Sequence, residues 1–238
     1  MPQPKAVLFD VDGTLIDTVD LHAQAWVEAL RHFNVETTCE DMRLQIGKGG
    51  DQLLQGLLPP GRIEDEADKI QSFRSELFKR NYLPQARAFP GVRELFEQIR
   101  SRGQRIVLAS SGKAEEVEAY KEIAGIADLI DDATSSDDAE RSKPFPDIFR
   151  AAFDKLGLVS ATEAMVVGDT PYDAEAARQA GLASVGVLCG GFAEDALRAS
   201  GCVAVYRDPQ HLAEAYDTSP LALGLAAAVQ AAAQEHGS

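Results

Sequence analysis

The fold is decided by Val7-Leu8-Phe9-Asp10-Val11-Asp12-Gly13-Thr14-Leu15, a stretch in which a short apolar run delivers two carboxylates two residues apart. The run from Ala6 to Phe9 has the length and the apolar character of a strand that is buried on both faces. Gly13 then supplies the backbone freedom for a sharp turn. The sequence therefore predicts that Asp10 and Asp12 lie at the carboxyl end of a buried strand.

Two carboxylates this close repel each other in a partly dry cleft, so the pair needs a cation, a shared proton or a donor beside it. We expect a divalent metal. Asp-x-Asp-Gly is also ordinary turn chemistry, and it opens the calcium loops of helix-loop-helix proteins. A calcium loop needs a further oxygen ligand and a closing Glu, whereas Thr14, Leu15 and Ile16 follow here. A simple turn and a metal-dependent catalytic site remain as the two interpretations.

The composition is that of an ordinary globular protein. With 238 residues, 45% of them hydrophobic, the chain is long enough for one α/β domain with a sizeable insertion. The 38 acidic and 23 basic residues give a formal charge of -15, so we expect no nucleic-acid partner. A small anionic substrate would need a metal ion and individually placed lysines or backbone N–H groups.

The cysteines and the two ends of the chain bear on its location. Three widely spaced cysteines, Cys39, Cys189 and Cys202, show no metal-ligand pattern and favour a reducing compartment, which we take to be the cytoplasm. The first residues contain no secretory apolar region. The apolar segment from Leu221 to Ala233 is shorter than the roughly 20 residues that span a bilayer, so we expect a terminal helix and no membrane partner.

Helical spacing dominates from residue 17 to residue 87. A helix is predicted after Asp17 or Thr18, a second one is marked by four leucines and ended by Gly61, and a third one precedes Pro84. No strand is predicted in this block, and Pro84 with the Phe89-Pro90-Gly91 turn is the expected exit hinge. We predict a helical cap domain at 17–87, inserted into a core domain formed by 1–16 and 88–238.

After residue 91, helices and strands alternate. Strands are predicted at 105–109, 164–167, 184–188 and 203–206, helices at 92–101 and 115–123, a further helix opening at 146–147, and a short apolar segment at 128–130. This alternation is typical of an α/β protein, with a Rossmann-like parallel sheet that helices cover on both faces. Ligands of such sheets bind outside the carboxyl ends of the strands.

Four loops are predicted at that edge of the sheet. The first carries Asp10 and Asp12, and the second offers Ser110, Ser111 and the N–H of Gly112 as an anion cradle. The third places Lys143 before Pro144, and the fourth is Gly168-Asp169-Thr170-Pro171-Tyr172-Asp173. Taken singly, these are also an ordinary Ser-Gly turn, a solvated lysine and a helix cap by Asp173.

Together, the four motifs resemble those of the haloacid-dehalogenase-like (HAD) hydrolase superfamily. They are Asp10-Val-Asp-Gly-Thr-Leu, a Ser after the next full strand, Lys143-Pro, and Gly-Asp169-x-x-x-Asp173. The resemblance spans about Ala6 to Tyr206. The helical block between the first two motifs resembles the cap of the branch that contains phosphoglycolate phosphatases and β-phosphoglucomutases.

The resemblance implies a role for each motif. Asp10 would be the nucleophile that forms an aspartyl-phosphate, and Asp12 the acid that protonates the leaving oxygen and then activates water. Mg²⁺ would be held by Asp10, the backbone carbonyl of Asp12, and Asp169. Lys143 and Ser110 would hold the phosphoryl oxygens, and Asp173 would orient a metal-bound water or Lys143.

Within the superfamily, the second aspartate disfavours dehalogenation, because dehalogenases lack it. Phosphatase and phosphosugar mutase use the same core and differ in what the cap presents. The loop Ile46-Gly47-Lys48-Gly49-Gly50-Asp51 falls where relatives place a specificity loop. It has Gly50 near the place where mutases carry an Arg for the second phosphate, and Gly112 stands where they tend to carry a Ser. Lys48 and Lys113 are possible substitutes.

His22 falls near a histidine that helps mutases position the acid, although an amphipathic-helix residue is the simpler interpretation. We expect a Mg²⁺-dependent phosphatase that hydrolyses the phosphate monoester of a small metabolite, with Lys48 and His22 as further substrate contacts. A β-phosphoglucomutase-like mutase is the alternative, and a non-catalytic binding protein on the same fold is the alternative of another class. The sequence does not indicate the oligomeric state.

Overall fold

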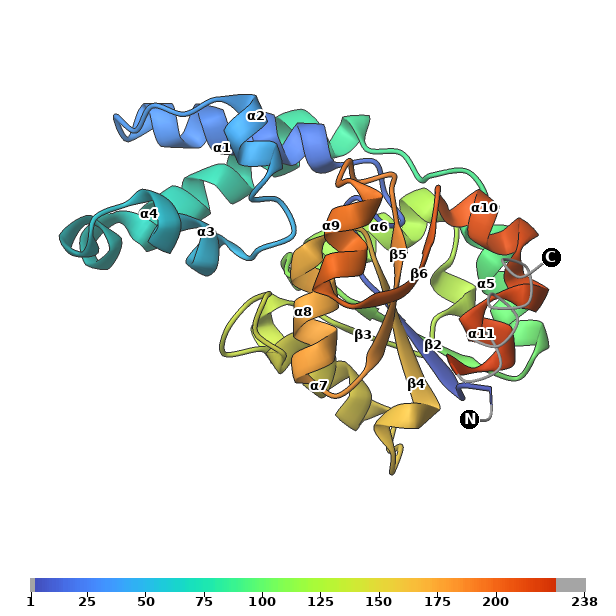
Figure 1. Ribbon diagram of the computed structural model, residues 1–238. Helices are drawn as coiled ribbons and strands as arrows, with labels where there is room; N and C mark the ends of the chain where they lie inside the picture. Colours follow the sequence, from blue (N-terminus) through green and yellow to red (C-terminus); the bar gives the residue numbers. More distant parts are fainter. Residues whose placement is uncertain (1–2, 226–238) are drawn as a thin grey trace.

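The computed structural model describes residues 3–225, and within that range six strands form one parallel sheet with the order β3-β2-β1-β4-β5-β6 (Figure 1). The strands are β1 (Ala6–Phe9), β2 (Arg105–Ala109), β3 (Asp132–Thr134), β4 (Ala164–Gly168), β5 (Ala183–Val187) and β6 (Cys202–Tyr206). The predicted α/β class is therefore confirmed. The apolar segment at 128–130 mostly forms a 3₁₀ turn (Ala127–Leu129), and the edge strand β3 follows it.

Helices cover both faces of the sheet, as the alternating side chains of β1 require. Val7 and Phe9 belong to one hydrophobic cluster and Ala6 and Leu8 to another. The first cluster includes side chains of α5 (Val92–Ser101), α6 (Ala114–Ala124), α10 (Pro209–Glu214) and α11 (Pro220–Leu223). The second includes α7 (Asp147–Lys155) and α8 (Pro171–Gln179), and α9 (Glu194–Ser200) packs beside α8.

The register of the sheet aligns the strand ends. Phe9 of β1 pairs with Leu108 of β2 on one side and with Val167 of β4 on the other. Asp10 consequently comes level with the last residues of both neighbouring strands, Ala109 and Gly168. The loops that follow β1, β2 and β4 therefore leave the sheet at one edge.

The helices between β1 and α5 lie beside the sheet and have a core of their own (Figure 1). They are α1 (Val19–His32), α2 (Cys39–Arg43), α3 (Gly50–Leu57) and α4 (Pro60–Leu77), followed by a π-helical turn (Phe78–Tyr82) and a 3₁₀ turn (Leu83–Gln85). The prediction that Gly61 ends a helix is wrong. Pro60 is the first residue of α4, a position where proline's fixed φ suits the helix.

The chain enters and leaves this helical block through two adjacent segments. The N–H of Asp17 donates to the carbonyl of Arg87 at 2.8 Å, and the N–H of Phe89 donates to the carbonyl of Leu15 at 2.9 Å. At the exit, Gly91 has a φ of 79°, a left-handed conformation that favours glycine. These bonds tie the two connections together at the edge of the sheet that carries the Asp10 loop.

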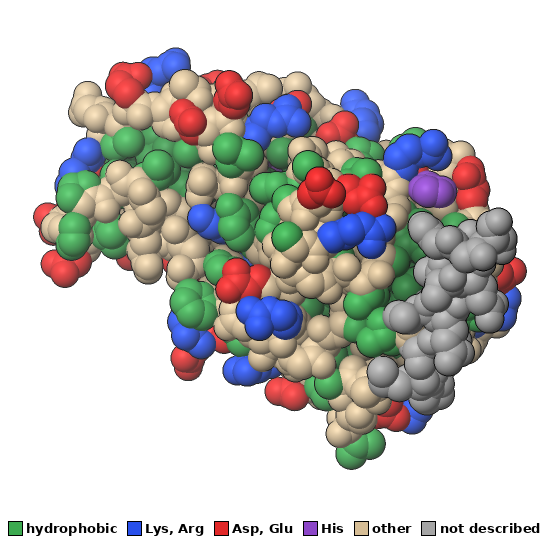
Figure 2. Space-filling view, viewed as in Figure 1, with side chains coloured by type: hydrophobic (Ala, Val, Ile, Leu, Met, Phe, Trp, Pro, Cys, Tyr) green, Lys and Arg blue, Asp and Glu red, His purple; other side chains and the backbone are tan. Residues whose placement is uncertain are grey.

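Charged side chains of both signs are mixed over the face drawn in Figure 2. Among residues 3–225, no helix has the combination of length and apolarity that a membrane crossing requires. The predicted terminal helix is described only in part, since α11 covers Pro220–Leu223 and residues 226–233 lie outside the described range.

Candidate active site

Asp10 and Lys143 form a buried ion pair at the carboxyl edge of the sheet. The ammonium of Lys143, which is fully buried, contacts Asp10 Oδ1 and Asp173 Oδ1, the latter at 2.8 Å, and donates to the carbonyl of Ala109 at 3.1 Å. Burial alone would lower the pKa of Lys143, but the charges and hydrogen bonds of the two aspartates raise it. The lysine is therefore held charged beside Asp10, and the interpretation of Lys143 as a solvated side chain is wrong.

A third carboxylate completes the group. Single oxygens of Asp10, Asp169 and Asp173 lie within 4.8 Å of one another. Thr14 Oγ1 donates to Asp169 Oδ1 at 2.8 Å and to Asp10 Oδ2 at 3.1 Å, whereas the buried Oδ2 of Asp169 has no hydrogen-bond partner within residues 3–225. An orphaned carboxylate oxygen of this kind is costly, because burial removes its water without replacing it.

The electrostatics of the group call for another cation. Burial and the neighbouring carboxylates of Asp173 and Asp12 raise the pKa of Asp10 to about 7, against the opposing charge of Lys143. Burial and the charges of Asp10 and Asp173 raise the pKa of Asp169 well above its usual range. Three carboxylates facing one ammonium leave two negative charges uncompensated. Oxygen ligands with this charge fit a divalent cation such as Mg²⁺.

Two glycines make room for Asp169. A Cβ on Gly13 would lie 2.4 Å from Asp169 Oδ2, and one on Gly190 would lie 1.6 Å from the same oxygen. Gly13 also has a φ of 80°. The Gly of the opening motif is therefore needed both for the predicted turn and for the close approach of the Asp169 carboxylate.

Asp173 serves two functions. It is the third residue of a capping box at the start of α8, where Thr170 Oγ1 accepts from the N–H of Asp173 at 3.1 Å and donates to Asp173 Oδ2 at 2.6 Å. Its other oxygen, Oδ1, pairs with Lys143. The helix cap and the site residue, which the sequence leaves as alternatives, are thus combined in one side chain.

Asp12 has different partners from Asp10. Its Oδ1 is 2.7 Å from Thr18 Oγ1 and 2.7 Å from His22 Nε2, so its side chain turns toward α1. Burial favours the neutral form, but the imidazole of His22 and the hydrogen bonds from His22 and Thr18 outweigh it and hold the pKa of Asp12 below its usual range. The side chain of Asp12 is not part of the carboxylate group around Lys143.

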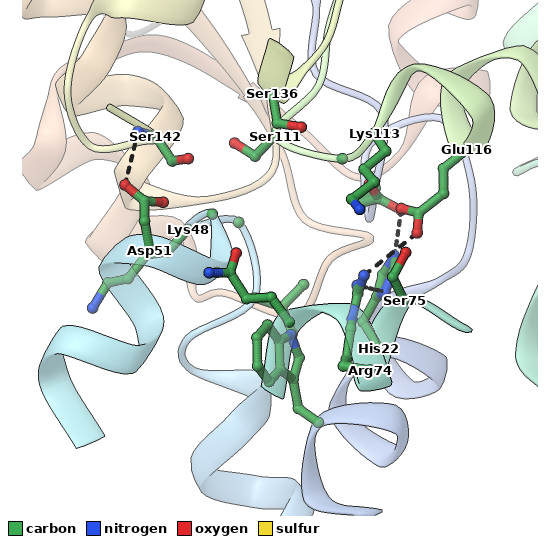
Figure 3. Close-up of a pocket in the computed structure, with 18 of the residues that line it drawn as sticks. His22, Lys48, Asp51, Arg74, Ser75, Ser111, Lys113, Glu116, Ser136 and Ser142 are labelled. Atoms are coloured by element: carbon green, nitrogen blue, oxygen red, sulfur yellow. Dashed lines mark hydrogen bonds and ion pairs between the residues drawn. The ribbon is translucent and has the colours of Figure 1, made fainter. Parts of the chain in front are cut away.

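The loop after β2 contributes hydroxyl groups. Ser110 is buried, and its Oγ accepts a hydrogen bond from the N–H of Gly112 at 2.9 Å. The Oγ of Ser111 is buried without a partner in the described part of the chain, and it faces the cavity (Figure 3). Ser111 is therefore available to a ligand, whereas Ser110 holds the turn.

A cavity of ≈ 120 Å³ lies between this edge and the helical block (Figure 3). The predicted site residues that line it are Asp10, Asp12, His22, Lys48, Ser111 and Gly112, together with Lys113. Of the described residues predicted to bind ligand, Ser110, Lys143 and Asp169 are not in this lining and lie behind it.

Lys48 lines the cavity, but its ammonium group contacts residues that do not line it. Its Nζ donates to Gln45 Oε1 at 2.7 Å and lies 4.7 Å from the centre of the Tyr172 ring. The glycines beside it allow close packing on the core: a Cβ on Gly49 would lie 1.9 Å from Ser142 Oγ, and one on Gly47 would lie 2.6 Å from Thr170 Cγ2. This loop therefore sits directly on the segments that carry Lys143 and Asp173.

Arg74 and Glu116 are two of the lining residues that were not predicted as site residues. Arg74 lies on α4 four residues after the buried Ile70, and Glu116 lies on α6 four residues before the buried Tyr120. A charged residue in register with an apolar helix face is the signal that could have identified both. The structure pairs them, with Arg74 Nη1 at 3.4 Å from Glu116 Oε1.

Comparison with known proteins agrees with this geometry. A family model described as haloacid dehalogenase-like hydrolase matches residues 4–181. The Dickeya dadantii protein IndB, described as a probable phosphatase, is 34% identical over 82% of this chain and 85% of its own. The phosphoglycolate phosphatase of Rhodospirillum rubrum is 30% identical over 86% of this chain and 88% of its own.

A solved structure shares the fold. The β-phosphoglucomutase of Clostridium difficile superposes with a TM-score of 0.75 over 88% of this chain and 93% of its own, at 20% identity. Together with the family match over residues 4–181, the four strand-end motifs identify the chain: it belongs to the haloacid dehalogenase-like hydrolase family.

Proposed function

We propose that this protein is a Mg²⁺-dependent phosphatase that hydrolyses the phosphate monoester of a small metabolite through an aspartyl-phosphate on Asp10. The observation that carries the proposal is the separation of two neighbouring aspartates: Asp10 pairs with Lys143, and Asp12 pairs with His22 and Thr18. This separation supports a role for Asp10 as the nucleophile and a role for Asp12 as the proton carrier. The phosphatase descriptions of two relatives support the same reaction class.

In the first step, a carboxylate oxygen of Asp10 forms a bond to phosphorus while the bond from phosphorus to the ester oxygen breaks. The leaving oxygen keeps the electron pair and takes a proton from Asp12, which gives a neutral alcohol. A phosphate group bound beside Asp12 favours the protonated carboxyl that this step needs, because like charges disfavour ionisation. Lys143 remains beside Asp10 and faces the negative charge of the phosphoryl group.

In the second step, the Asp12 carboxylate takes a proton from water as the water oxygen attacks phosphorus. The bond between phosphorus and Asp10 breaks, which releases inorganic phosphate and restores both aspartates. Mg²⁺, held by Asp10, Asp169 and the backbone carbonyl of Asp12, would supply neutralisation of the phosphoryl charge.

We further propose that residues 17–87 act as a cap domain over a core domain formed by 1–16 and 88–238. The separate hydrophobic core of the helical block and its two adjacent connections support this division. The small cavity enclosed between the two parts favours a small leaving group. A cap that excludes water also protects the aspartyl-phosphate from premature hydrolysis.

The cations of the cap favour a phosphatase over a mutase. A mutase must grip a second phosphate, but Lys48 is bound to Gln45 and lies over Tyr172, and Arg74 is engaged with His22 and Glu116. Among the lining residues, Lys113 is a cation without an ion pair in the described part of the chain. One exposed lysine is a weak site for a dianion.

The test is a panel of phosphorylated metabolites with Mg²⁺, in which we expect release of inorganic phosphate. Asp10→Asn should lose this activity, while Asp17→Asn, an exposed aspartate of the same loop, should keep it. Conversion of β-glucose 1-phosphate to the 6-phosphate in the presence of a bisphosphate, without net phosphate release, would instead support the mutase. Wild-type rates in Asp10→Asn would refute the mechanism.

A further inference from the structure

A series of four polar side chains runs from the core into the cap and back to the candidate acid, Asp12, and Figure 3 shows its first three members, Glu116, Arg74 and His22. It begins at Glu116 on the core helix α6, where Oε1 lies 3.4 Å from Nη1 of Arg74 on the cap helix α4. Nη2 of Arg74 contacts Nδ1 of His22 on α1. His22 Nε2 then lies 2.7 Å from Asp12 Oδ1, in the loop after β1.

The chemistry of arginine fixes the direction of the hydrogen bonds in this series of side chains. A guanidinium group has N–H donors and no acceptor, so Nδ1 of His22 accepts from Arg74. The other ring nitrogen, Nε2, therefore carries the hydrogen and donates it to Asp12 Oδ1. The ring orientation of His22, and with it the direction of the bond to Asp12, depends on where Arg74 is held.

Aromatic packing leaves Arg74 and His22 little freedom. The guanidinium carbon lies 5.1 Å from the centre of the Phe78 ring and 5.4 Å from that of Trp26. The His22 ring stacks on Phe78 with centroids 4.0 Å apart and an angle of 11° between the planes. These contacts fix the plane of each group, and the ion pair to Glu116 fixes how far Arg74 reaches toward His22.

Because it is buried, Glu116 holds Arg74, and through it the other side chains of the series, in place. Its side chain is 6% exposed and that of Arg74 is 15% exposed, so removal of either charge strands the other in a partly dry environment. The neighbouring Glu115 also pairs with the cap, through Lys79, but those side chains are 78% and 57% exposed, where an ion pair contributes little.

We infer that Glu116 is a positioning residue for proton transfer: through Arg74 and His22, it sets the hydrogen bond that aligns Asp12 with the leaving oxygen. Because Glu116 belongs to the core and Arg74 to the cap, the alignment is complete only when the cap rests on the core. Phosphoryl transfer to a substrate with a poor leaving group is thereby restricted to the covered site. This inference rests on the proposed function.

Leaving-group dependence tests the inference. p-Nitrophenyl phosphate and phenyl phosphate have nearly the same size, but only phenolate needs help from an acid as it leaves. Since kcat/KM reports steps up to loss of the leaving group, Glu116→Ala should lower kcat/KM for phenyl phosphate about tenfold or more, and that for p-nitrophenyl phosphate by less than about threefold. Glu115→Ala, the matched control, should change neither value.

A second pair of variants separates positioning from folding. Glu116→Gln keeps the volume of the side chain and should show the same selective loss. In a His22→Ala background, Glu116→Ala should produce no further selectivity, because the series is already interrupted. Equal losses for both substrates, or no loss, would overturn the inference.

Magnetic resonance of histidine ring nitrogens gives a readout that needs no activity. His22 should show the Nε2–H tautomer in the wild type and in Glu115→Ala, and should lose it in Glu116→Ala. An unchanged His22 signal in Glu116→Ala would overturn the inference. A wild type that hydrolyses neither these esters nor any member of the metabolite panel would refute the proposed phosphatase instead, and the tautomer experiment would still decide whether Glu116 orients His22.

Discussion

Asp10 and Asp12 are two residues apart, yet the first is paired with a lysine of the core and the second with a histidine of the helical block. The two carboxylates therefore have partners in different parts of the molecule. Burial and nearby carboxylates raise the pKa of Asp10 to about 7, whereas His22 and Thr18 lower the pKa of Asp12 despite burial. Two identical side chains are thus given different chemistry by their surroundings.

Replacement of Asp12 by Asn should separate the two proposed steps. Loss of a general acid and base typically costs about 10²–10⁴ in rate. Because p-nitrophenolate leaves without an acid, Asp12→Asn should still react with p-nitrophenyl phosphate once and then retain the phosphoryl group. Mass spectrometry of the intact protein after mixing would detect this adduct, and rapid turnover in Asp12→Asn would contradict the assignment.

Magnesium should stabilise the protein against heat. A ligand that binds only the folded state adds about 2.7 kcal/mol when its concentration is 100 times its dissociation constant. We therefore expect Mg²⁺ to raise Tm in the wild type but not in Asp169→Asn, since Asp169 supplies the orphaned oxygen. Asp128→Asn, at an exposed ion pair, is the matched control and should behave as the wild type does. An equal rise in Asp169→Asn would place the metal elsewhere.

The metal-free protein should lose stability as pH rises toward neutrality. The folded-state pKa of Asp10, about 7, exceeds its ordinary value of 3.8, so the folded state holds a proton that the unfolded chain releases. The stabilisation from this proton is complete below the unfolded-state pKa of Asp10 and is lost as pH rises through the folded-state pKa. The Tm of chelator-treated protein should therefore fall as pH rises from about 5 to about 8, the range that contains the folded-state pKa of Asp10. Saturating Mg²⁺ should flatten that slope, and an identical slope with Mg²⁺ would contradict the account.

The glycines of the loop at residues 46–51 should be required for its close packing on the core. Gly49→Ala would place a Cβ 1.9 Å from Ser142 Oγ and should lower kcat/KM by displacing the loop that carries Lys143. The double variant with Ser142→Gly should recover part of the loss. Gly56→Ala, on α3 with no atom within 4 Å of its Cβ among described residues, should be neutral or stabilising by up to about 1 kcal/mol. Wild-type kinetics in Gly49→Ala would refute this role for the loop.

The strands and helices that frame the site follow from local patterns. Buried apolar runs predicted β2 and β4 to within a residue, and the Val92–Ser101 helix was predicted with its observed bounds. The edge strand β3, with the sequence Asp132-Ala133-Thr134, has too little apolar character for such a pattern. The Pro59-Pro60-Gly61 run indicates a helix end and a helix start equally well, and the packing of α4 on α1 and α3 decides for the start.

The carboxylates of the site could be predicted because they follow buried strands, and Lys143 could be predicted because it precedes Pro144 in a Lys-Pro motif. The contact between Arg74 and Glu116 could not, since it joins two helices that the sequence separates by 42 residues. Each of these two residues, taken alone, resembles a solvated helix charge. Lys48 lines the cavity, but its contacts with the ring of Tyr172 and the amide of Gln45 could not be predicted from the sequence.

The most direct test of the account is to identify the phosphorylated residue. Rapid quenching of the wild-type protein or of Asp12→Asn during turnover of p-nitrophenyl phosphate with Mg²⁺, followed by proteolysis and mass spectrometry, should place the phosphoryl group on Asp10. Asp10→Asn should yield no modified peptide. A phosphoryl group on another residue, or full turnover by Asp10→Asn, would contradict the proposed mechanism.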